Sequence, residues 1–389
     1  MIKSRKIFWA VAGLALITVI AGIILESIPS RFSYKDQFTS TVAASAEGVL
    51  PAVLATSLAP KPVTHIATPH IVRGVYMTAC IAASPTLRKN FMENIANTVV
   101  NALIVDIKDY TGTLAFSGTK VLSPKGNGCR VRDLPAFIAE LHEKGIYAIA
   151  RVTVFQDPLY ASTHPEMAIQ SESRPGLPWQ DKNGLAFIDP DFPEYWDYII
   201  AIAKEAYDIG FDEVNFDYIR FPSDGDMNDA NFAIPEGSSR ALVMEDFFAY
   251  LSSELAGTGV VTSADIFGQT VTNRDDMGIG QIYEKVLPYF DFVSPMVYPS
   301  HFTKGFMGFE NPASEPYQIL RSTMISAVER AIAVEISPAK IRPWLQAFDL
   351  GADYTPEMIR QETKGINDAG VDSWLLWDAG NSYDREALR

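Results

Sequence analysis

The chain has 389 residues, of which 48% are hydrophobic and 11% aromatic, so it can bury a sizeable core in one large domain or two. Its formal net charge is −15. This argues against nucleic acid and anionic membrane surfaces as partners, because such surfaces select patches of Lys and Arg. A neutral or cationic ligand fits this composition better.

The first segment, residues 1–28, has three basic residues followed by an uncharged apolar run at 7–25. A run of this length is about enough to cross a membrane as a helix. We therefore predict an uncleaved, single-pass transmembrane signal anchor, with the basic end in the cytoplasm and the rest of the chain exported. The alternative is a cleaved signal peptide and a secreted protein. Its apolar part is normally shorter, however, and the one small-residue cleavage sequence, at 44–46, lies far downstream.

The next segment, 29–69, is rich in Ser, Thr, Ala and Pro and has no sustained hydrophobic period, which predicts a flexible linker. From 70 to 389, apolar strand-like runs alternate with amphipathic helical segments. Strands are predicted at about 71–78, 101–108, 147–155, 211–219, 260–267, 290–298, 341–348 and 373–378. Helices are predicted near 85–98, 133–144, 193–208, 240–256, 279–287, 315–334 and 355–369.

Strand and helix alternation with short returns indicates parallel strands. Eight such units favour a closed (β/α)8 TIM barrel over an open sheet, which usually has fewer strands. No GxGxxG sequence follows the first strand, so nothing supports a dinucleotide site. We predict an α/β TIM barrel over 70–389 that uses no cofactor.

The parity of each strand separates side chains that face the barrel interior from those that face the helices. On the fourth strand this turns Asn215 and Asp217 inward, near the end that carries the active site in TIM barrels. The same reasoning on the other strands and the loops after them predicts a site that also includes Tyr76, Asp106, Lys108, Arg151, Arg220, Asp265, Tyr298, His301, Trp344, Gln346, Trp377 and Asp378.

This set is rich in carboxylates and aromatic rings. Two carboxyl groups facing each other across a cleft are what glycosidic bond cleavage requires. The rings of Tyr76, Trp179, Tyr298, Trp344 and Trp377 are candidate platforms for sugar rings. The chain has five histidines, which makes a zinc site or a Ser-His-Asp triad hard to assemble.

Several of these carboxylates also have a structural interpretation. Asp106 could form an interior ion pair with Lys108 or Arg151, and Asp217 could pair with Arg151 or Arg220. The sequence alone does not decide whether these residues take part in catalysis or form structural ion pairs.

The two cysteines of the chain, Cys80 and Cys129, are expected in loops on one face of the barrel. Outside the cytoplasm an accessible pair tends to oxidise, so a disulfide is one of two interpretations. Two unrelated buried thiols are the alternative.

Five sequences resemble a family of bacterial glycosyl hydrolase domains, TIM barrels related to the alpha-amylase-like and other glycoside hydrolases. The resemblance covers about 70–385 and is carried by VRGVYMTA at 72–79, NALIVDIKD at 101–109, FDEVNFDYIRFPSDG at 211–225, SADIFG at 263–268 and MVYPSH at 296–301. It implies glycosidase chemistry, with Asp217 as the nucleophile at the end of the fourth strand. Amylase-like barrels usually have Glu at the end of the fifth strand, where this chain has Asp265; Asp378 is the alternative general acid.

These observations predict a membrane-anchored glycoside hydrolase that faces away from the cytoplasm and cleaves an extracellular or cell-envelope polysaccharide. One alternative is a catalytically inactive barrel that binds glycan or a partner protein. Another is a divalent-metal enzyme with Asp106, Asp217 and Asp265 as oxygen ligands, although no spacing in the sequence demands a metal.

Overall fold

The fold is taken from a computed structural model that describes residues 63–117, 121 and 123–389. The predicted signal anchor and the linker up to residue 62 lie outside these residues. Within the described residues, no helix is both long and apolar enough to cross a membrane.

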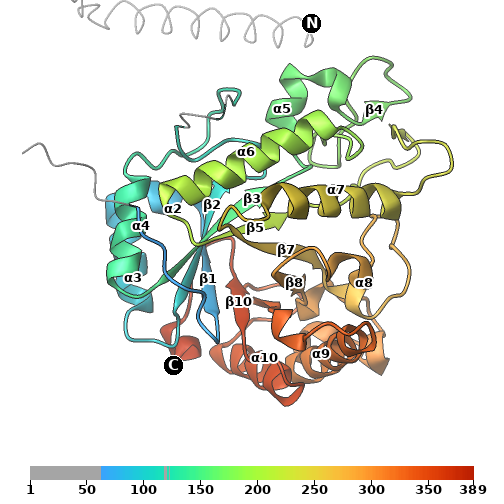
Figure 1. Ribbon diagram of the computed structural model, residues 1–389. Helices are drawn as coiled ribbons and strands as arrows, with labels where there is room; N and C mark the ends of the chain where they lie inside the picture. The colour runs from blue at the N-terminus through green and yellow to red at the C-terminus, as the bar shows by residue number, and fades with distance from the viewer. Residues whose placement is uncertain (1–62, 118–120, 122) are drawn as a thin grey trace, which may run out of the picture. The chain divides into compact units, whose positions relative to one another are not determined.

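Eight parallel strands close into a barrel in the order β1-β10-β9-β8-β7-β5-β3-β2 (Figure 1). Each strand coincides with a predicted strand, and the closed (β/α)8 barrel is confirmed. In chain order the strands are β1 (Arg73–Met77), β2 (Ala102–Lys108), β3 (Tyr147–Thr153), β5 (Glu213–Asp217), β7 (Val261–Phe267), β8 (Phe292–Met296), β9 (Trp344–Gln346) and β10 (Trp374–Trp377).

Helices surround the barrel, and the seven predicted helices are present. They are α3 (Pro85–Ile95), α4 (Leu134–Glu143), α6 (Pro193–Ile209), α7 (Arg240–Leu255), α8 (Tyr283–Val286), α9 (Pro316–Ala333) and α10 (Pro356–Asp368). Local sequence explains several ends. For example, the Ser84 hydroxyl accepts a hydrogen bond from the Leu87 N–H at the start of α3, and Gly210 ends α6 at φ +123°.

The structure also contains short elements that the sequence did not predict. Helices α2 (Ala79–Ala83) and α5 (Pro158–Thr163) follow β1 and β3, and the strands β4 (Gln170–Ser171) and β6 (Ala230–Asn231) pair separately from the barrel. The 3-10 turns are η1 (Pro165–Met167), η2 (Gly268–Val271), η3 (Pro299–His301), η4 (Phe306–Gly308), η5 (Pro312–Ser314), η6 (Pro338–Lys340) and η7 (Arg385–Leu388).

The hydrophobic core has two layers. Val214 and Phe216 of β5 belong to the larger layer between strands and helices, as parity predicts. A smaller cluster that includes Ile104, Tyr147 and Ile149 fills the barrel interior. Because alternate strand residues face the two layers, Asn215 between Val214 and Phe216, and Asp217 after Phe216, face the interior.

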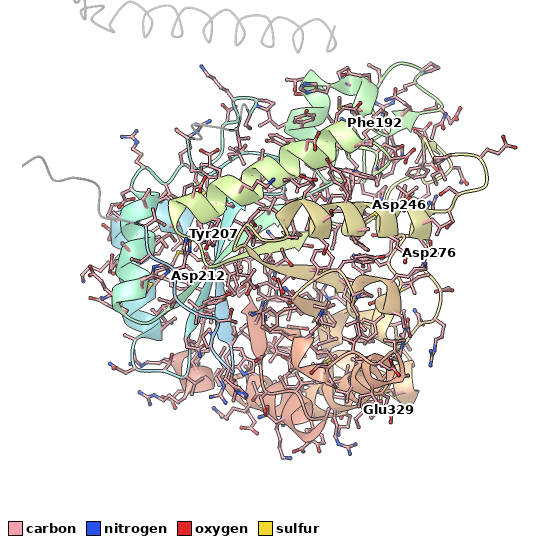
Figure 2. The ribbon with its side chains drawn as sticks, viewed as in Figure 1. Phe192, Tyr207, Asp212, Asp246, Asp276 and Glu329 are labelled. Carbon is pink, nitrogen blue, oxygen red and sulfur yellow. A yellow bond between two sulfur atoms is a disulfide. The ribbon has the colours of Figure 1, made fainter. Side chains whose placement is uncertain are left out.

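The amino-terminal ends of the strands are covered by residues 63–69, which belong to the last part of the predicted linker. The Ile66 N–H donates to Asp212 Oδ1 at 2.8 Å, and the His65 ring stacks on Tyr207 with ring centroids 3.9 Å apart. Figure 2 labels Tyr207 and Asp212, which anchor this segment. The base of the barrel is therefore closed, which leaves the opposite end for a site.

Candidate active site

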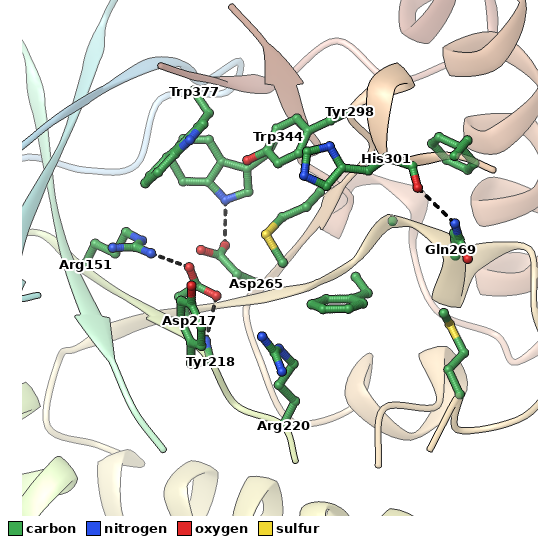
Figure 3. A pocket seen from close by; sticks show the side chains of 15 residues that line it. Arg151, Asp217, Tyr218, Arg220, Asp265, Gln269, Tyr298, His301, Trp344 and Trp377 are labelled. Carbon is green, nitrogen blue, oxygen red and sulfur yellow. Dashed lines mark hydrogen bonds and ion pairs between the residues drawn. The ribbon is translucent and has the colours of Figure 1, made fainter. Parts of the chain in front are cut away.

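A pocket of about 410 Å³ opens at the carboxyl-terminal ends of the barrel strands (Figure 3). This is the end at which TIM barrels place their active sites. Eight of the predicted site residues line it: Arg151, Asp217, Arg220, Asp265, Tyr298, His301, Trp344 and Trp377.

Arg151 is the charged residue of the pocket that forms two ion pairs. Its Nη1 donates to Asp106 Oδ1 at 2.6 Å, and its Nη2 donates to Asp217 Oδ2. Burial would lower the pKa of Arg151, but Asp106 and Asp217 outweigh it and raise that pKa well above its ordinary value. Arg151 is therefore a permanent cation that forms ion pairs with both Asp106 and Asp217.

The turn at the end of β5 fixes Asp217. The Asp217 Oδ1 accepts a hydrogen bond from the backbone N–H of Tyr218 at 2.6 Å. Tyr218 has φ +53°, a left-handed conformation that is uncommon for a residue other than glycine. Such strain is retained where the surrounding structure imposes it, and it is concentrated at functional sites.

Asp265 has a different environment. Its Oδ1 accepts hydrogen bonds from the Asn215 amide at 2.8 Å and from the Trp344 indole at 2.7 Å, both neutral donors. The side chain is 1% exposed. Burial, followed by the nearby charge of Asp217, raises the pKa of Asp265 well above its ordinary value.

The two aspartates lie on hydrogen-bonded neighbouring strands. The β5–β7 register pairs Asn215 with Ser263 and Phe216 with Ala264, so the next step of the register brings Asp217 beside Asp265. Neighbouring strands are about 4.8 Å apart. The pocket therefore holds one carboxylate paired with a cation beside one carboxyl group that has only neutral donors.

A chain of hydrogen bonds continues below Asp265 into the barrel. The Asn215 amide also donates to Ser263, the Ser263 hydroxyl donates to Glu213 at 2.6 Å, and Arg342 pairs with Glu213. Asn215, predicted as a substrate ligand, is fully buried here and does not line the pocket. It positions Asp265.

Aromatic rings form one wall of the pocket. Tyr76 stacks on Trp377 with centroids 3.9 Å apart, and Trp344 meets Trp377 edge-on at 5.7 Å. Of the rings predicted as sugar platforms, Trp344 is 1% exposed, and Trp377 is partly exposed. Trp377 is thus the ring with the most surface available for a sugar. Trp179, also 1% exposed, packs in the outer core instead.

Tyr76 and Asp106 lie behind the pocket surface. The Tyr76 hydroxyl donates to Asp106 Oδ2 at 2.5 Å, while the other Asp106 oxygen binds Arg151. Neither Tyr76 nor Asp106 lines the pocket. They hold Arg151 and Trp377 in place, which corresponds to the structural interpretation of Asp106.

Lys108 lies away from the pocket, although parity predicted that it points into the barrel. A register irregularity between Asp106 and Lys108 interrupts the alternation of β2. The Lys108 ammonium is fully buried, pairs with Asp157 at 2.8 Å and donates to the Tyr195 hydroxyl of α6. It joins strands to a helix and cannot contact a ligand in the pocket.

Gln346 and Asp378 also fall outside the pocket lining. Gln346 is fully buried; its side chain accepts from the Ser300 N–H and donates to the Phe348 carbonyl. Asp378 accepts from the N–H groups of Gly380 and Ser382 and so closes a turn. Both residues shape loops, and Asp378 is not placed to act as the general acid.

The predicted site omitted seven residues that line the pocket: Phe267, Gly268, Gln269, Tyr218, Met277, Met296 and Phe302. The first three follow directly at the end of β7, a position that could have identified them. Gly268 is required there because a Cβ would lie 2.3 Å from the Met296 carbonyl oxygen. Met277 and Phe302 lie in loops, where no hydrophobic period places a side chain.

The described residues contain no cluster of three or more His, Cys, Asp or Glu side chains arranged to hold a metal ion. The predicted oxygen ligands Asp106 and Asp217 are bridged by the Arg151 guanidinium, so a cation already lies between them. Cys80 of α2 and Cys129, in the segment after β2, form a disulfide.

Carboxyl groups and aromatic rings at the carboxyl-terminal mouth of a closed (β/α)8 barrel are typical of carbohydrate-cleaving barrel enzymes. Residues 74–383 match the family model described as "Putative glycosyl hydrolase domain". The chain belongs to this family, which places it among the glycoside hydrolases.

Solved structures share the fold at low sequence identity. The PgaB (BpsB) glycoside hydrolase domain from Bordetella bronchiseptica is 18% identical, with 82% of this chain and 98% of that chain covered and a TM-score of 0.59. For alpha-L-fucosidase isoenzyme 2 from Paenibacillus thiaminolyticus the identity is 15%, the coverage 82% and 48%, and the TM-score 0.53. The comparison with curated proteins found no match.

Proposed function

We propose that this pocket hydrolyses a glycosidic bond with Asp217 as the nucleophile and Asp265 as the general acid. The observation that carries the proposal is the asymmetry of the two carboxyl groups. Arg151 forms an ion pair with Asp217, whereas burial and the Asp217 charge favour a protonated Asp265. A nucleophile must be ionised and a general acid must carry a proton.

The reaction follows from these two states. Asp265 gives its proton to the leaving-group oxygen while Asp217 attacks the anomeric carbon, which forms a glycosyl-enzyme ester and releases the first sugar. Asp265 then takes a proton from water, whose oxygen attacks the same carbon and frees Asp217. The positions of Asp217 and Asp265 on neighbouring strands support this retaining course, since retaining enzymes hold their carboxyl groups about 5 Å apart.

The proposed substrate is an extracellular or cell-envelope polysaccharide, cleaved by a barrel tethered to the outer side of the cell membrane. Three features support this: the basic residues before the apolar run at 7–25, the polar sequence after it, and the disulfide, which suits an oxidising compartment. Protease added to intact cells should release the barrel in soluble form. A barrel that stays protected until the membrane is lysed would contradict this location.

The catalytic assignment can be tested by release of reducing ends from a panel of polysaccharides. The wild type, Asp217→Asn and Asp265→Asn would be compared with Asp378→Asn, a matched change outside the pocket. We expect loss of turnover in the first two variants and retention in the third. Glycan binding without turnover in every form of the protein would instead indicate a non-catalytic, glycan-binding barrel.

A further inference from the structure

Arg220 is a buried cation that faces the pocket without an acidic partner. It is 8% exposed, and it forms no ion pair within the described part of the chain. Its Nη1 donates to the Phe221 carbonyl at 3.0 Å. Asp181, Asp217 and Asp224 act on it electrostatically from beyond ion-pair distance. The other two arginines of the barrel interior, Arg151 and Arg342, each contact a carboxylate.

The backbone around Arg220 is fixed before any ligand binds. The Phe221 N–H donates to the Ile279 carbonyl at 2.9 Å, and the Gln281 amide donates to the Ile219 carbonyl at 3.2 Å. The guanidinium lies 4.6 Å from the centroid of the Phe267 ring. Aromatic contact covers the flat face of a guanidinium and leaves the N–H groups on its edge for a ligand.

The position of Arg220 in the pocket indicates which part of a bound sugar chain it could contact. Figure 3 shows its side chain pointing into the pocket from the side opposite Trp344 and Trp377. A sugar chain that contacts Trp377 and reaches past Asp217 and Asp265 would bring a neighbouring unit to Arg220. A buried cation without a counter-ion costs several kcal/mol of desolvation, and an anion on the substrate would offset that cost.

We propose that Arg220 forms a subsite for the carboxylate of an acidic sugar, so that the glycan cleaved by this pocket contains uronic acid units. The inference rests on the proposed function for the sugar chain itself. A guanidinium binds a carboxylate through two parallel hydrogen bonds, which gives geometric selectivity as well as affinity. A phosphate ester offers the same anionic chemistry but carries about −1.5 to −2 charges, which suits a pocket that already contains the Asp217 carboxylate less well.

The net charge of the chain, −15, predicted a neutral or cationic ligand. Long-range attraction of an acidic polymer is indeed unfavourable with this charge, and salt screens it beyond about 10 Å. Discrimination in favour of an acid therefore has to come from a contact inside the pocket, where a desolvated Arg220 is effective.

The test uses single sugars, so it does not depend on hydrolysis. Calorimetry would compare D-glucuronate, D-glucose and D-glucose 6-phosphate on the wild type, Arg220→Met, Arg220→Lys and Arg321→Met. Arg321 lies exposed on α9 and serves as the charge-matched control.

We expect the wild type and Arg321→Met to bind glucuronate at least about 10-fold more tightly than glucose. Arg220→Met should weaken glucuronate binding by about 10- to 100-fold and leave glucose binding unchanged, with Arg220→Lys in between. Equal affinity for glucuronate and glucose in the wild type, or no measurable glucuronate binding, overturns the inference. Tighter binding of glucose 6-phosphate than of glucuronate overturns the choice of a carboxylate.

The wild-type ratio of glucuronate to glucose affinity decides the question even if Arg220→Met does not fold. The outcomes also separate the two proposals. Preference for glucuronate without hydrolysis of any glycan supports the Arg220 subsite and removes the proposed activity. Hydrolysis with no preference for an acid does the reverse.

Discussion

Replacing Asp217 by Asn separates a catalytic carboxylate from a structural one. The change keeps the shape of the side chain but removes one of the two carboxylates on Arg151. Removing one partner of a buried ion pair costs about 3–5 kcal/mol when the other charge is left alone. Here Asp106 remains bound to Arg151 at 2.6 Å, so the loss should approach that of one charge-assisted hydrogen bond, about 2 kcal/mol. For a domain of this size that lowers Tm by about 4 °C.

The catalytic effect should be far larger, because an amide neither attacks an anomeric carbon nor activates water. We expect the rate to fall by about 1,000-fold or more. Asp106→Asn is the matched control: it is the same change on the same guanidinium, but Asp106 does not line the pocket. It should cost similar stability, measured by thermal unfolding, and retain most of the turnover. An Asp217→Asn variant that keeps more than about a tenth of the activity would refute the nucleophile assignment.

Three further predictions concern protonation, packing and the disulfide. Burial raises the pKa of Asp265. Between about pH 4, the ordinary pKa of the unfolded state, and the raised pKa, the folded state therefore binds more protons than the unfolded state. Over this range the free energy of unfolding falls as pH rises. Asp265→Asn should make this slope shallower in thermal unfolding, with the remainder due to other buried carboxyl groups such as Glu362, and wild-type activity should fall as pH rises through the pKa of Asp265. Lys108→Met should cost about 3–5 kcal/mol of stability, because it leaves Asp157 buried without its partner, and it should leave KM unchanged. A higher KM at unchanged Tm would instead show that Lys108 contacts the substrate. Replacing Cys80 and Cys129 by Ala should cost about 4 kcal/mol for a sequence separation of 49 residues, visible as a lower Tm; an unchanged Tm would contradict it.

The barrel was predictable because its strands are short apolar runs separated by amphipathic segments. The run at 211–219 contains β5 at Glu213–Asp217, and parity correctly turned Asn215 and Asp217 into the interior. Parity failed at Lys108 because a single register irregularity inverts every later side chain, and no sequence period encodes it.

The site was predictable where strands build it and not where loops do. Arg151 and Asp265 lie on strands, so alternation placed them. Met277 and Phe302 come from connecting segments whose path depends on tertiary contacts. Gln346 was placed correctly on its strand but does not line the pocket, because its amide group is hydrogen-bonded to two loops.

The different surroundings of the two catalytic candidates follow from the order of the strands. The register pairs Arg151 of β3 with Asp106 of β2 on one side and with Asn215 of β5 on the other, so its guanidinium reaches Asp106 and Asp217. Asp265 belongs to β7, on the far side of β5 from β3, and the next interior cation, Arg342, is bound to Glu213. Asp265 consequently receives only neutral donors. Because a buried carboxyl group without a cation favours its protonated form, the strand order β2-β3-β5-β7 explains why a cation pairs with Asp217 while burial raises the pKa of Asp265.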